Sequence, residues 1–278
     1  MNDAQLKDYF KTTFNAVADG YDGLPTRFFP QSAEQTVSFL NLNGDEQILD
    51  VATGTGWVAL AAAKLVSDGH VNAIDLSDGM LAQAQQKQHQ AKLSNITFTE
   101  MDMQKLDFPD NHFDTAISAF SLFFVEDMTA QLQHIASKVK NKGQIITSTF
   151  YDDAFSPLAT LFLDRLATYG IEIPSLAWKR IATKEHCTTI FDEAELTDIS
   201  CHQVDSGYYF RDADDWWYMI WNAGFRGLVA QLSDEDLIKF KHEHLAEVNQ
   251  LATDDGIWLQ LDILYTIGTK STLKQEKT

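Results

Sequence analysis

The residues with the clearest chemical potential form a glycine-containing turn at residues 48–60, ILDVATGTGWVAL. An apolar strand leads to Asp50, the turn Ala52-Thr53-Gly54-Thr55-Gly56 follows, and a helix is predicted from Trp57. Glycine reaches positive φ and lacks the Cβ that keeps a ligand away from the backbone. The first N–H groups of the helix point into such a turn. The spacing Gly54-x-Gly56-x-x-Ala59 also fits the loose dinucleotide fingerprint, so a nicotinamide cofactor remains open at this point.

Two further carboxylates follow the next two predicted strands. Asp75 ends the second strand, 25 residues after Asp50, where a carboxylate accepts hydrogen bonds from a ribose diol. Asp102 ends the third strand and Met103 follows it; the acid suits the exocyclic amine of an adenine, and the thioether packs on its ring. The carboxyl ends of the strands in an open α/β sheet meet at one edge, so the three acids are predicted to share a crevice. An acidic crevice favours a positively charged ligand over a pyrophosphate.

Short apolar strands alternate with amphipathic helices through residues 46–150, which predicts βαβ units and a doubly wound, mostly parallel sheet. The predicted strands are 47–52, 70–75, 96–102, 113–120 and 144–150, and the predicted helices between them are 57–66, 79–93 and 128–140. After residue 150 the alternation loosens. Residues 207–210, GYYF, and 261–269, LDILYTIGT, are expected to pair as an antiparallel edge.

The expected organisation has six segments. They are an N-terminal helical segment over the cofactor cleft (1–45), a Rossmann-like cofactor-binding core (46–150) and a first lid part (151–184). A core helix and strand (185–210), a second helical lid part (211–255) and a last core strand with a tail (256–278) follow.

Four motifs in order resemble the class I S-adenosylmethionine-dependent methyltransferases, nearest to the quinone-biosynthesis C-methyltransferase-like (type 11) group. The segments are DVATGTG, NAIDLSDGMLAQA, TEMDMQKLDFPDNHFDTAISAFSLFFVED and VKNKGQIITSTF, within residues 50–150. Ala52 stands where glycine is commoner, and Asn141 replaces the usual proline. The resemblance implies a Rossmann-like α/β fold with a mostly parallel seven-stranded sheet, an antiparallel last strand and helical lid insertions.

The resemblance also implies roles for residues at the motif positions. Residues Asp50, Ala52, Thr53, Gly54, Thr55 and Gly56 would shape the methionine-end pocket of S-adenosylmethionine. The ribose would bind Asp75, the adenine would lie against Leu76, Met80, Asp102 and Met103, and the methionine moiety would contact Phe120 and Ser121. Quinone methyltransferases usually have a polar pair where this chain has Phe123-Phe124, which removes one candidate base.

Methyl transfer from a sulfonium is an in-line displacement that alignment and desolvation can largely drive. Tyr21 lies where relatives place a residue over the cofactor, and it is the candidate catalytic residue, with packing of a helix onto the sheet as the alternative. Candidate acceptor-binding residues are Phe124, Tyr151, Trp217, Trp221 and Arg226. The tryptophans at i, i+4 spacing in residues 211–255 also fit core packing, which we favour for most of them.

No metal site is expected. His242-Glu243-His244 resembles a ligand cluster, but residues at i and i+2 point to opposite sides of a helix, so a solvated helix face is the favoured interpretation. Cys187 and Cys201 fit neither a disulfide framework nor a C-x-x-C motif.

The charge composition restricts the classes of molecule that this protein can bind. Twenty-one basic against 40 acidic residues give a formal net charge of −19, and no basic stripe interrupts the acidity, which argues against nucleic acid. No apolar stretch is long enough for a transmembrane helix, and the charged N-terminus does not resemble a signal peptide, so a cytoplasmic location is expected.

These observations predict a methyltransferase that uses S-adenosyl-L-methionine, releases S-adenosyl-L-homocysteine and acts on a small-molecule acceptor. The nucleophile (N, O, S or C), the acceptor and the oligomeric state stay open. A catalytically inactive cofactor-binding regulator is the first alternative, and a nicotinamide-dependent oxidoreductase is the second.

Overall fold

The computed structural model describes residues 3–173 and 175–272. The described part up to residue 150 contains α1 (Asp3–Val17), η1 (Ala18–Gly20), η2 (Leu24–Thr26), α2 (Phe28–Ser38), β1 (Gln47–Val51), α3 (Trp57–Leu65), β2 (His70–Asp75), α4 (Asp78–Ala91), β3 (Ile96–Glu100), β4 (Phe113–Ala119), η3 (Leu122–Phe124), α5 (Met128–Lys138) and β5 (Val139–Phe150). The remainder holds α6 (Leu158–Thr168), η4 (Ala177–Ile181), α7 (Lys184–Glu193), β6 (Leu196–Asp205), β7 (Tyr208–Phe210), α8 (Ala213–Asn222), α9 (Arg226–Val229), α10 (Asp234–Val248), η5 (Asn249–Leu251), β8 (Ile257–Leu259) and β9 (Asp262–Lys270).

Seven strands form one sheet in the order β3-β2-β1-β4-β5-β9-β6. The first five strands pair in parallel, and β9 runs antiparallel between β5 and β6. The order reverses at β1 and β4, the kind of switch point where open α/β sheets bind ligands. The prediction of a mostly parallel seven-stranded sheet with an antiparallel last strand is confirmed.

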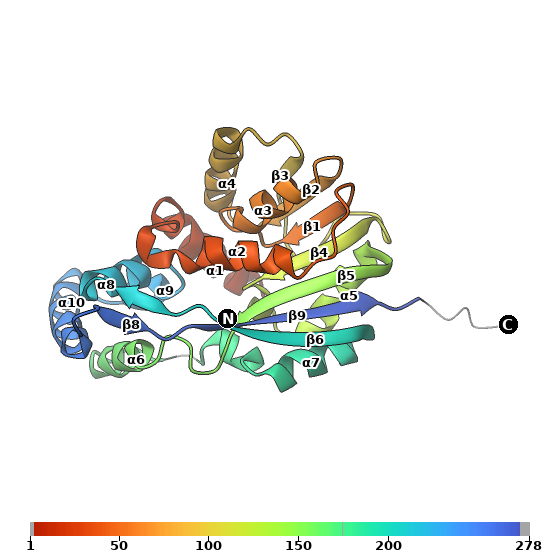
Figure 1. Cartoon of the computed structure of the whole chain (residues 1–278). Helices are drawn as coiled ribbons and strands as arrows, with labels where there is room; N and C mark the ends of the chain where they lie inside the picture. The colour runs from red at the N-terminus through yellow and green to blue at the C-terminus, as the bar shows by residue number, and fades with distance from the viewer. Residues whose placement is uncertain (1–2, 174, 273–278) are drawn as a thin grey trace.

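The two faces of the sheet are separate apolar cores because strand residues alternate in direction. Ile48 and Ile146 pack with α2 and α3 on one face, whereas Leu49 and Ile145 pack with α5 and α7 on the other. Helix α2 crosses one face beside β1 and β5, and α7 lies behind β6 (Figure 1). Burial on both faces holds the strand ends in fixed positions, which is what a site built at those ends requires.

The antiparallel pairing predicted for residues 207–210 is wrong in its partner. Strand β7, Tyr208–Phe210, pairs with β8, Ile257–Leu259, in a separate two-stranded sheet. Strand β9 instead pairs with β6, with Cys201 opposite Thr266. The continuous apolar run 257–269 hides a break at residues 260–261, where the chain passes from one sheet to the other.

The helices α6, α8, α9 and α10 gather with the small sheet at one end of the molecule (Figure 1). Trp216 of α8 is fully buried there, and its indole Nε1 donates to His244 Nε2 on α10 at 2.9 Å. The solvated interpretation of residues 242–244 is therefore wrong for His244, which is fully buried, although His242 is exposed. The Ser233 hydroxyl accepts from the Asp236 amide at 3.1 Å, so the predicted helix start at Ser233 is confirmed.

In residues 3–173 and 175–272, none of the helices has both the length and the apolar character needed to cross a membrane.

Replacing His244 with Ala should lower the free energy of unfolding by about 2–4 kcal/mol, because it opens a cavity and leaves the buried Trp216 N–H without an acceptor. The exposed His242→Ala is the matched control and should change stability by less than about 0.5 kcal/mol. Urea denaturation of both variants measures this. Equal effects would contradict the assignment of His244 to the core.

The same histidine should make stability depend on pH. Burial lowers the pKa of His244 from 6.5 to about 4, with Glu247 opposing and Arg165 assisting the shift. The unfolded chain therefore takes up a proton at a higher pH than the folded chain, so this contribution is complete above about pH 6.5 and is lost toward pH 4. Wild type should lose up to about 3 kcal/mol more than His244→Gln across that window. Parallel stability curves for the two proteins would refute it.

Candidate active site

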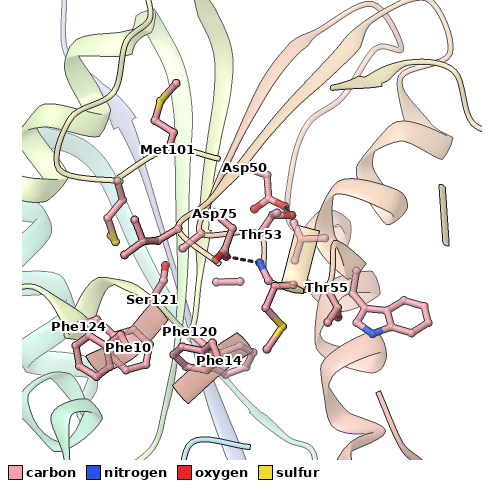
Figure 2. Close-up of a pocket in the computed structure, with 18 of the residues that line it drawn as sticks. Phe10, Phe14, Asp50, Thr53, Thr55, Asp75, Met101, Phe120, Ser121 and Phe124 are labelled. Atoms are coloured by element: carbon pink, nitrogen blue, oxygen red, sulfur yellow. Dashed lines mark hydrogen bonds between the residues drawn. The ribbon is translucent and has the colours of Figure 1, made fainter. Parts of the chain in front are cut away.

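A cavity of about 180 Å³ lies at the carboxyl ends of β1, β2 and β4. Helices α1 and α2 close it from the opposite side. Its lining comprises Leu6, Lys7, Phe10, Phe14, Tyr21, Phe29, Ser32, Ala33, Asp50, Ala52, Thr53, Gly54, Thr55, Trp57, Val58, Asp75, Leu76, Met80, Met101, Asp102, Met103, Gln104, Ala119, Phe120, Ser121, Phe124 and Val125. Figure 2 shows the labelled carboxylates Asp50 and Asp75 on one side of the cavity and the labelled phenylalanines on the other.

The glycine turn between β1 and α3 is held by backbone hydrogen bonds. The Thr53 amide donates to the Ile74 carbonyl at 2.8 Å, and the Gly56 amide donates to the Thr53 carbonyl at 2.9 Å. Gly54 has φ +56°, and a Cβ placed there would meet no atom within 4 Å, so its open side faces space for a ligand. Gly56 has φ +84°, and a Cβ would come within 2.7 Å of Ala84 Cβ, so this glycine permits close packing of the turn on α4.

Asp75, the last residue of β2, is oriented by the turn. Gly54 N donates to its Oδ2 at 2.7 Å (Figure 2), and Ser77 N donates to its Oδ1 at 2.9 Å. Burial raises the pKa of Asp75 although these backbone donors lower it. Each carboxylate oxygen keeps a second lone pair for a ligand hydroxyl.

Asp50 is a buried acid beside the turn. Its Oδ2 accepts a hydrogen bond from the Thr53 hydroxyl at 2.5 Å, and burial raises its pKa to about 7. Among the described residues no ion pair joins Asp50 or Asp75 to a cationic side chain, and the charge of Asp75 repels that of Asp50, which also raises the pKa of Asp50. Two close buried carboxylates without a cation create a negative potential that favours a positively charged ligand.

Asp102 lies two residues beyond the end of β3, so the strand is shorter than predicted. Its Oδ2 pairs with Lys7 Nζ of α1 at 2.9 Å, and its Oδ1 accepts from the Gln104 amide at 2.9 Å. Met103 lines the same part of the cavity, and its carbonyl accepts from the Gln131 side chain at 2.7 Å. A third acid is thus fixed in the crevice, with a lysine from the N-terminal helix against it.

Six aromatic side chains wall the rest of the cavity, from α1, α2, the segment between them and the end of β4. Ring centroids are 4.7 Å apart for Phe10–Phe124, 5.7 Å for Phe14–Phe124 and 5.8 Å for Phe29–Phe120. Sequence reasoning identified Tyr21, Phe120 and Phe124 but missed the other three. Phe10 and Phe14 belong to an apolar i, i+4 stripe on α1, and Phe29 lies at the start of α2; such a pattern does not reveal what a helix covers.

Tyr21 lies in this wall, stacked on Phe29 with centroids 4.6 Å apart. Its hydroxyl has no hydrogen-bond partner among the described residues. Burial, with repulsion from Asp22 and Asp75, raises the pKa of Tyr21, so the phenol stays protonated near neutral pH. It can donate a hydrogen bond into the cavity but cannot serve as a phenolate base.

Sequence reasoning also missed Asp22, which ties the N-terminal segment to the glycine turn. Its Oδ1 accepts from the Thr55 hydroxyl at 2.7 Å and from Trp57 Nε1 at 2.8 Å. Its Oδ2 pairs with Lys87 of α4, whose ammonium lies 4.0 Å above the Trp57 ring. The covering segment is therefore anchored to the same turn that shapes the cavity.

Four of the five candidate acceptor-binding residues lie outside the cavity lining; only Phe124 is part of it. Tyr151 follows β5, and its amide donates to the Asp262 carbonyl. Trp217 is buried and stacks on Trp221, which in turn lies under Arg226. The structure brings these last three residues together with one another but not with the glycine turn.

The described residues contain no cluster of three or more His, Cys, Asp or Glu side chains that could hold a metal ion.

Comparison with known proteins agrees with this geometry. A family model for a methyltransferase domain matches residues 48–143. The chain is 28% identical over 168 residues to the aklanonic acid methyltransferase DauC of Streptomyces sp. (strain C5), covering 57% of this chain and 76% of the relative. It is also 28% identical over 189 residues to the ubiquinone/menaquinone biosynthesis C-methyltransferase UbiE of Pseudomonas putida, covering 62% of this chain and 73% of the relative.

Solved structures share the fold. The YcgJ protein of Bacillus subtilis superposes with a TM-score of 0.60 at 18% identity, covering 87% of this chain and 99% of that one. Phosphoethanolamine N-methyltransferase 2 of Haemonchus contortus, solved with S-adenosyl-L-methionine, gives a TM-score of 0.61 at 17% identity, covering 96% and 60%. The fold, the domain match and the relatives identify this chain as an S-adenosylmethionine-dependent methyltransferase with a class I, Rossmann-like core.

Proposed function

We propose that this methyltransferase acts on a small molecule that enters the cavity between the three carboxylates and the aromatic wall. The observation that carries the proposal is the composition of this single cavity. Asp50, Asp75 and the glycine turn lie on one side, and aromatic rings line the other. Two relatives are named for small acceptors, aklanonic acid and demethylmenaquinone, which supports an acceptor of this size.

The residues present fit S-adenosylmethionine, which supplies an electrophilic methyl group on a cationic sulfur. The open side of Gly54 gives room against the turn, and the free lone pairs of Asp75 suit the ribose hydroxyls. Leu76, Met80 and Met103 offer apolar surface for the adenine, and Asp102 offers an acceptor for its amine. The uncompensated charge of Asp50 favours a cationic methionine end.

The acceptor side of the proposed site can orient the acceptor and exclude water, but it does not provide a general base. Its lining is aromatic, its lysine is paired with Asp102, and the Tyr21 phenol remains protonated. An acceptor must therefore bring a nucleophile that is already reactive, while the rings exclude water and hold it in line. Tyr21 can orient the acceptor by donating a hydrogen bond.

A cofactor-binding protein without methyl transfer is the second candidate. The lack of a base on the aromatic, acceptor side of the cavity favours it, as does Phe124 at a position that is polar in quinone methyltransferases. The fold alone does not decide, because the [4+2]-cyclase SpnF has the same fold, with a TM-score of 0.58 at 18% identity and coverage of 96% of this chain and 95% of that one. A nicotinamide cofactor is not favoured. Its pyrophosphate would be negatively charged, and the cavity lining places carboxylates there, while the lysine of the lining is paired with Asp102.

Charge and thiol state support the remaining parts of the proposal. A net charge of −19 disfavours nucleic-acid substrates. Cys187 and Cys201 are free thiols, which fits the reducing conditions of the cytoplasm, where we place the protein.

The function is tested by incubating the purified protein with cell extract and isotopically labelled methyl donor. Mass spectrometry should detect a labelled small molecule that is absent without the protein. Calorimetry should show that both S-adenosylmethionine and S-adenosylhomocysteine bind. Binding without any labelled product would favour the second candidate, and no binding of either nucleoside at millimolar concentration would refute the cofactor site.

Asp75→Ala should weaken S-adenosylhomocysteine binding by about 1–3 kcal/mol, because the ribose hydroxyls lose their acceptor. Asp68→Ala is the matched control, since Asp68 is an exposed acid two residues before β2. Calorimetric titration of both variants measures the difference. Full affinity in Asp75→Ala would show that the ribose lies elsewhere.

Tyr21→Phe should lower kcat by about 100-fold while S-adenosylhomocysteine affinity stays within a few-fold, because only the donated hydrogen bond is lost. Tyr218→Phe removes a hydroxyl that donates to the Gly20 carbonyl at 2.8 Å outside the cavity lining, and it should leave kcat unchanged. Methyl transfer to the acceptor identified above gives the rates. An unaltered rate in Tyr21→Phe would assign Tyr21 to packing.

A further inference from the structure

Arg226 is the one arginine of this chain without a hydrogen-bond acceptor among the described residues, which include all five arginines. Arg27 and Arg180 donate to backbone carbonyls, and Arg165 and Arg211 pair with carboxylates. The Nη1 atom of Arg226 is buried and has no partner. A buried cationic N–H group normally has an acceptor, so this one requires an explanation.

Stacking fixes the orientation of the Arg226 guanidinium. Its Cζ lies 3.3 Å from the ring centroid of Trp221, and Trp221 stacks on Trp217 with centroids 6.0 Å apart. All N–H bonds of a guanidinium lie in its plane, so a ring below it leaves the donor edge free. Such an edge matches the two oxygens of a carboxylate.

Because the chain is rich in acidic residues, the absence of a carboxylate partner for Arg226 needs a specific explanation. The chain has 40 acidic residues, yet no neighbouring carboxylate contributes to the environment of Arg226, where burial alone lowers the pKa. An unpaired buried charge destabilises a fold. The cost is offset when an anionic ligand occupies the donor edge. Arg226 as a whole is half-buried, so part of its side chain still reaches solvent.

The position of Arg226 connects it with the helix that covers the cavity. Arg226 begins α9, which packs against α1. A Cβ built on Gly227 of α9 would lie 2.0 Å from the Tyr9 hydroxyl of α1. The next residue of α1, Phe10, lines the cavity. Arg226 therefore belongs to a helix that packs against the helix carrying this part of the aromatic wall.

We propose that Arg226, held on the ring of Trp221, forms an anion site that binds the carboxylate of a small organic acid. Two sources share this chemistry: the methyl acceptor itself, or a separate carboxylate that binds beside the cavity. The first source rests on the function proposed above, whereas the anion site does not.

The test is calorimetric titration with naphthoate and with its neutral analogue naphthamide. Wild type should bind naphthoate more tightly than naphthamide, and Arg226→Gln should weaken naphthoate binding by about tenfold or more without affecting naphthamide. Arg226→Lys keeps the positive charge but not the two-donor edge of the guanidinium, so its naphthoate affinity should lie between those of wild type and Arg226→Gln. Lys239→Gln removes an exposed positive charge of α10 and should change naphthoate affinity by less than about twofold.

Two results would overturn the site. One is equal binding of naphthoate and naphthamide to wild type, or binding of neither. The other is an unchanged naphthoate affinity in Arg226→Gln. In that case a lowered Tm of Arg226→Met would show that Arg226 serves to pack on Trp221. Titration of S-adenosylhomocysteine in parallel separates the two proposals, because its failure to bind wild type refutes the cofactor site and leaves the naphthoate result valid.

The source of the carboxylate is decided with hydroxynaphthoate and labelled methyl donor. Methylation with a raised KM and an unchanged kcat in Arg226→Gln would assign the carboxylate to the acceptor. Binding that depends on Arg226 without methylation would assign it to a separate ligand.

Discussion

Burial of negative charge without a compensating cation is the constraint on which the site depends. Asp50 is the last residue but one of β1, and Asp75 ends the neighbouring parallel strand β2, so both carboxylates lie at the same edge of the sheet and the charge of Asp75 repels that of Asp50. The backbone offsets part of that cost, since Gly54 and Ser77 both donate to Asp75. What remains is a site whose electrostatic balance is completed only by a cation.

The N-terminal segment supplies the other half of this environment. Phe10, Phe14 and Phe29 keep water from the carboxylates, and Asp22 anchors the segment to the turn through Thr55. The exclusion of water therefore strengthens the electrostatic effect of the carboxylates. The burial that raises the pKa of Asp50 also strengthens its attraction for a positive ligand, because low polarity enlarges every charge interaction in the cavity.

The glycine turn and the strand-end acids could be predicted because their signals are local. A strand, a turn and a helix follow one another at residues 47–65, and the parallel sheet then dictates that Asp50 and Asp75 meet. The fold class followed from the same alternation. Ala52 adopts a left-handed φ of +58°, which alanine does not favour, so the surrounding structure and not the residue type must hold this part of the turn.

Contacts between distant segments could not be predicted, because an apolar stripe shows that a helix face is buried but not what it covers. Phe10 and Phe14 look like ordinary core positions until α1 is placed over the cavity. His244 looked solvated beside His242, and only the arrival of Trp216 from α8 explains its burial. The exchange of strand partners after Leu259 is likewise a tertiary event, without a breaker such as Pro or Gly to mark it.

The fold keeps uncompensated charges of opposite sign apart, and this separation has a functional consequence. Lys7 shows the effect of bringing them together, because its ammonium pairs with Asp102 at 2.9 Å and balances the charge of that acid. Had Arg226 reached Asp50 or Asp75, the protein would gain an ion pair and lose the negative site. Helix α1 lies between these positions, lining the cavity on one side and touching α9 on the other. Helix α1 therefore separates Arg226 from the carboxylate crevice, and this separation leaves the crevice without a cation to neutralise Asp50 and Asp75.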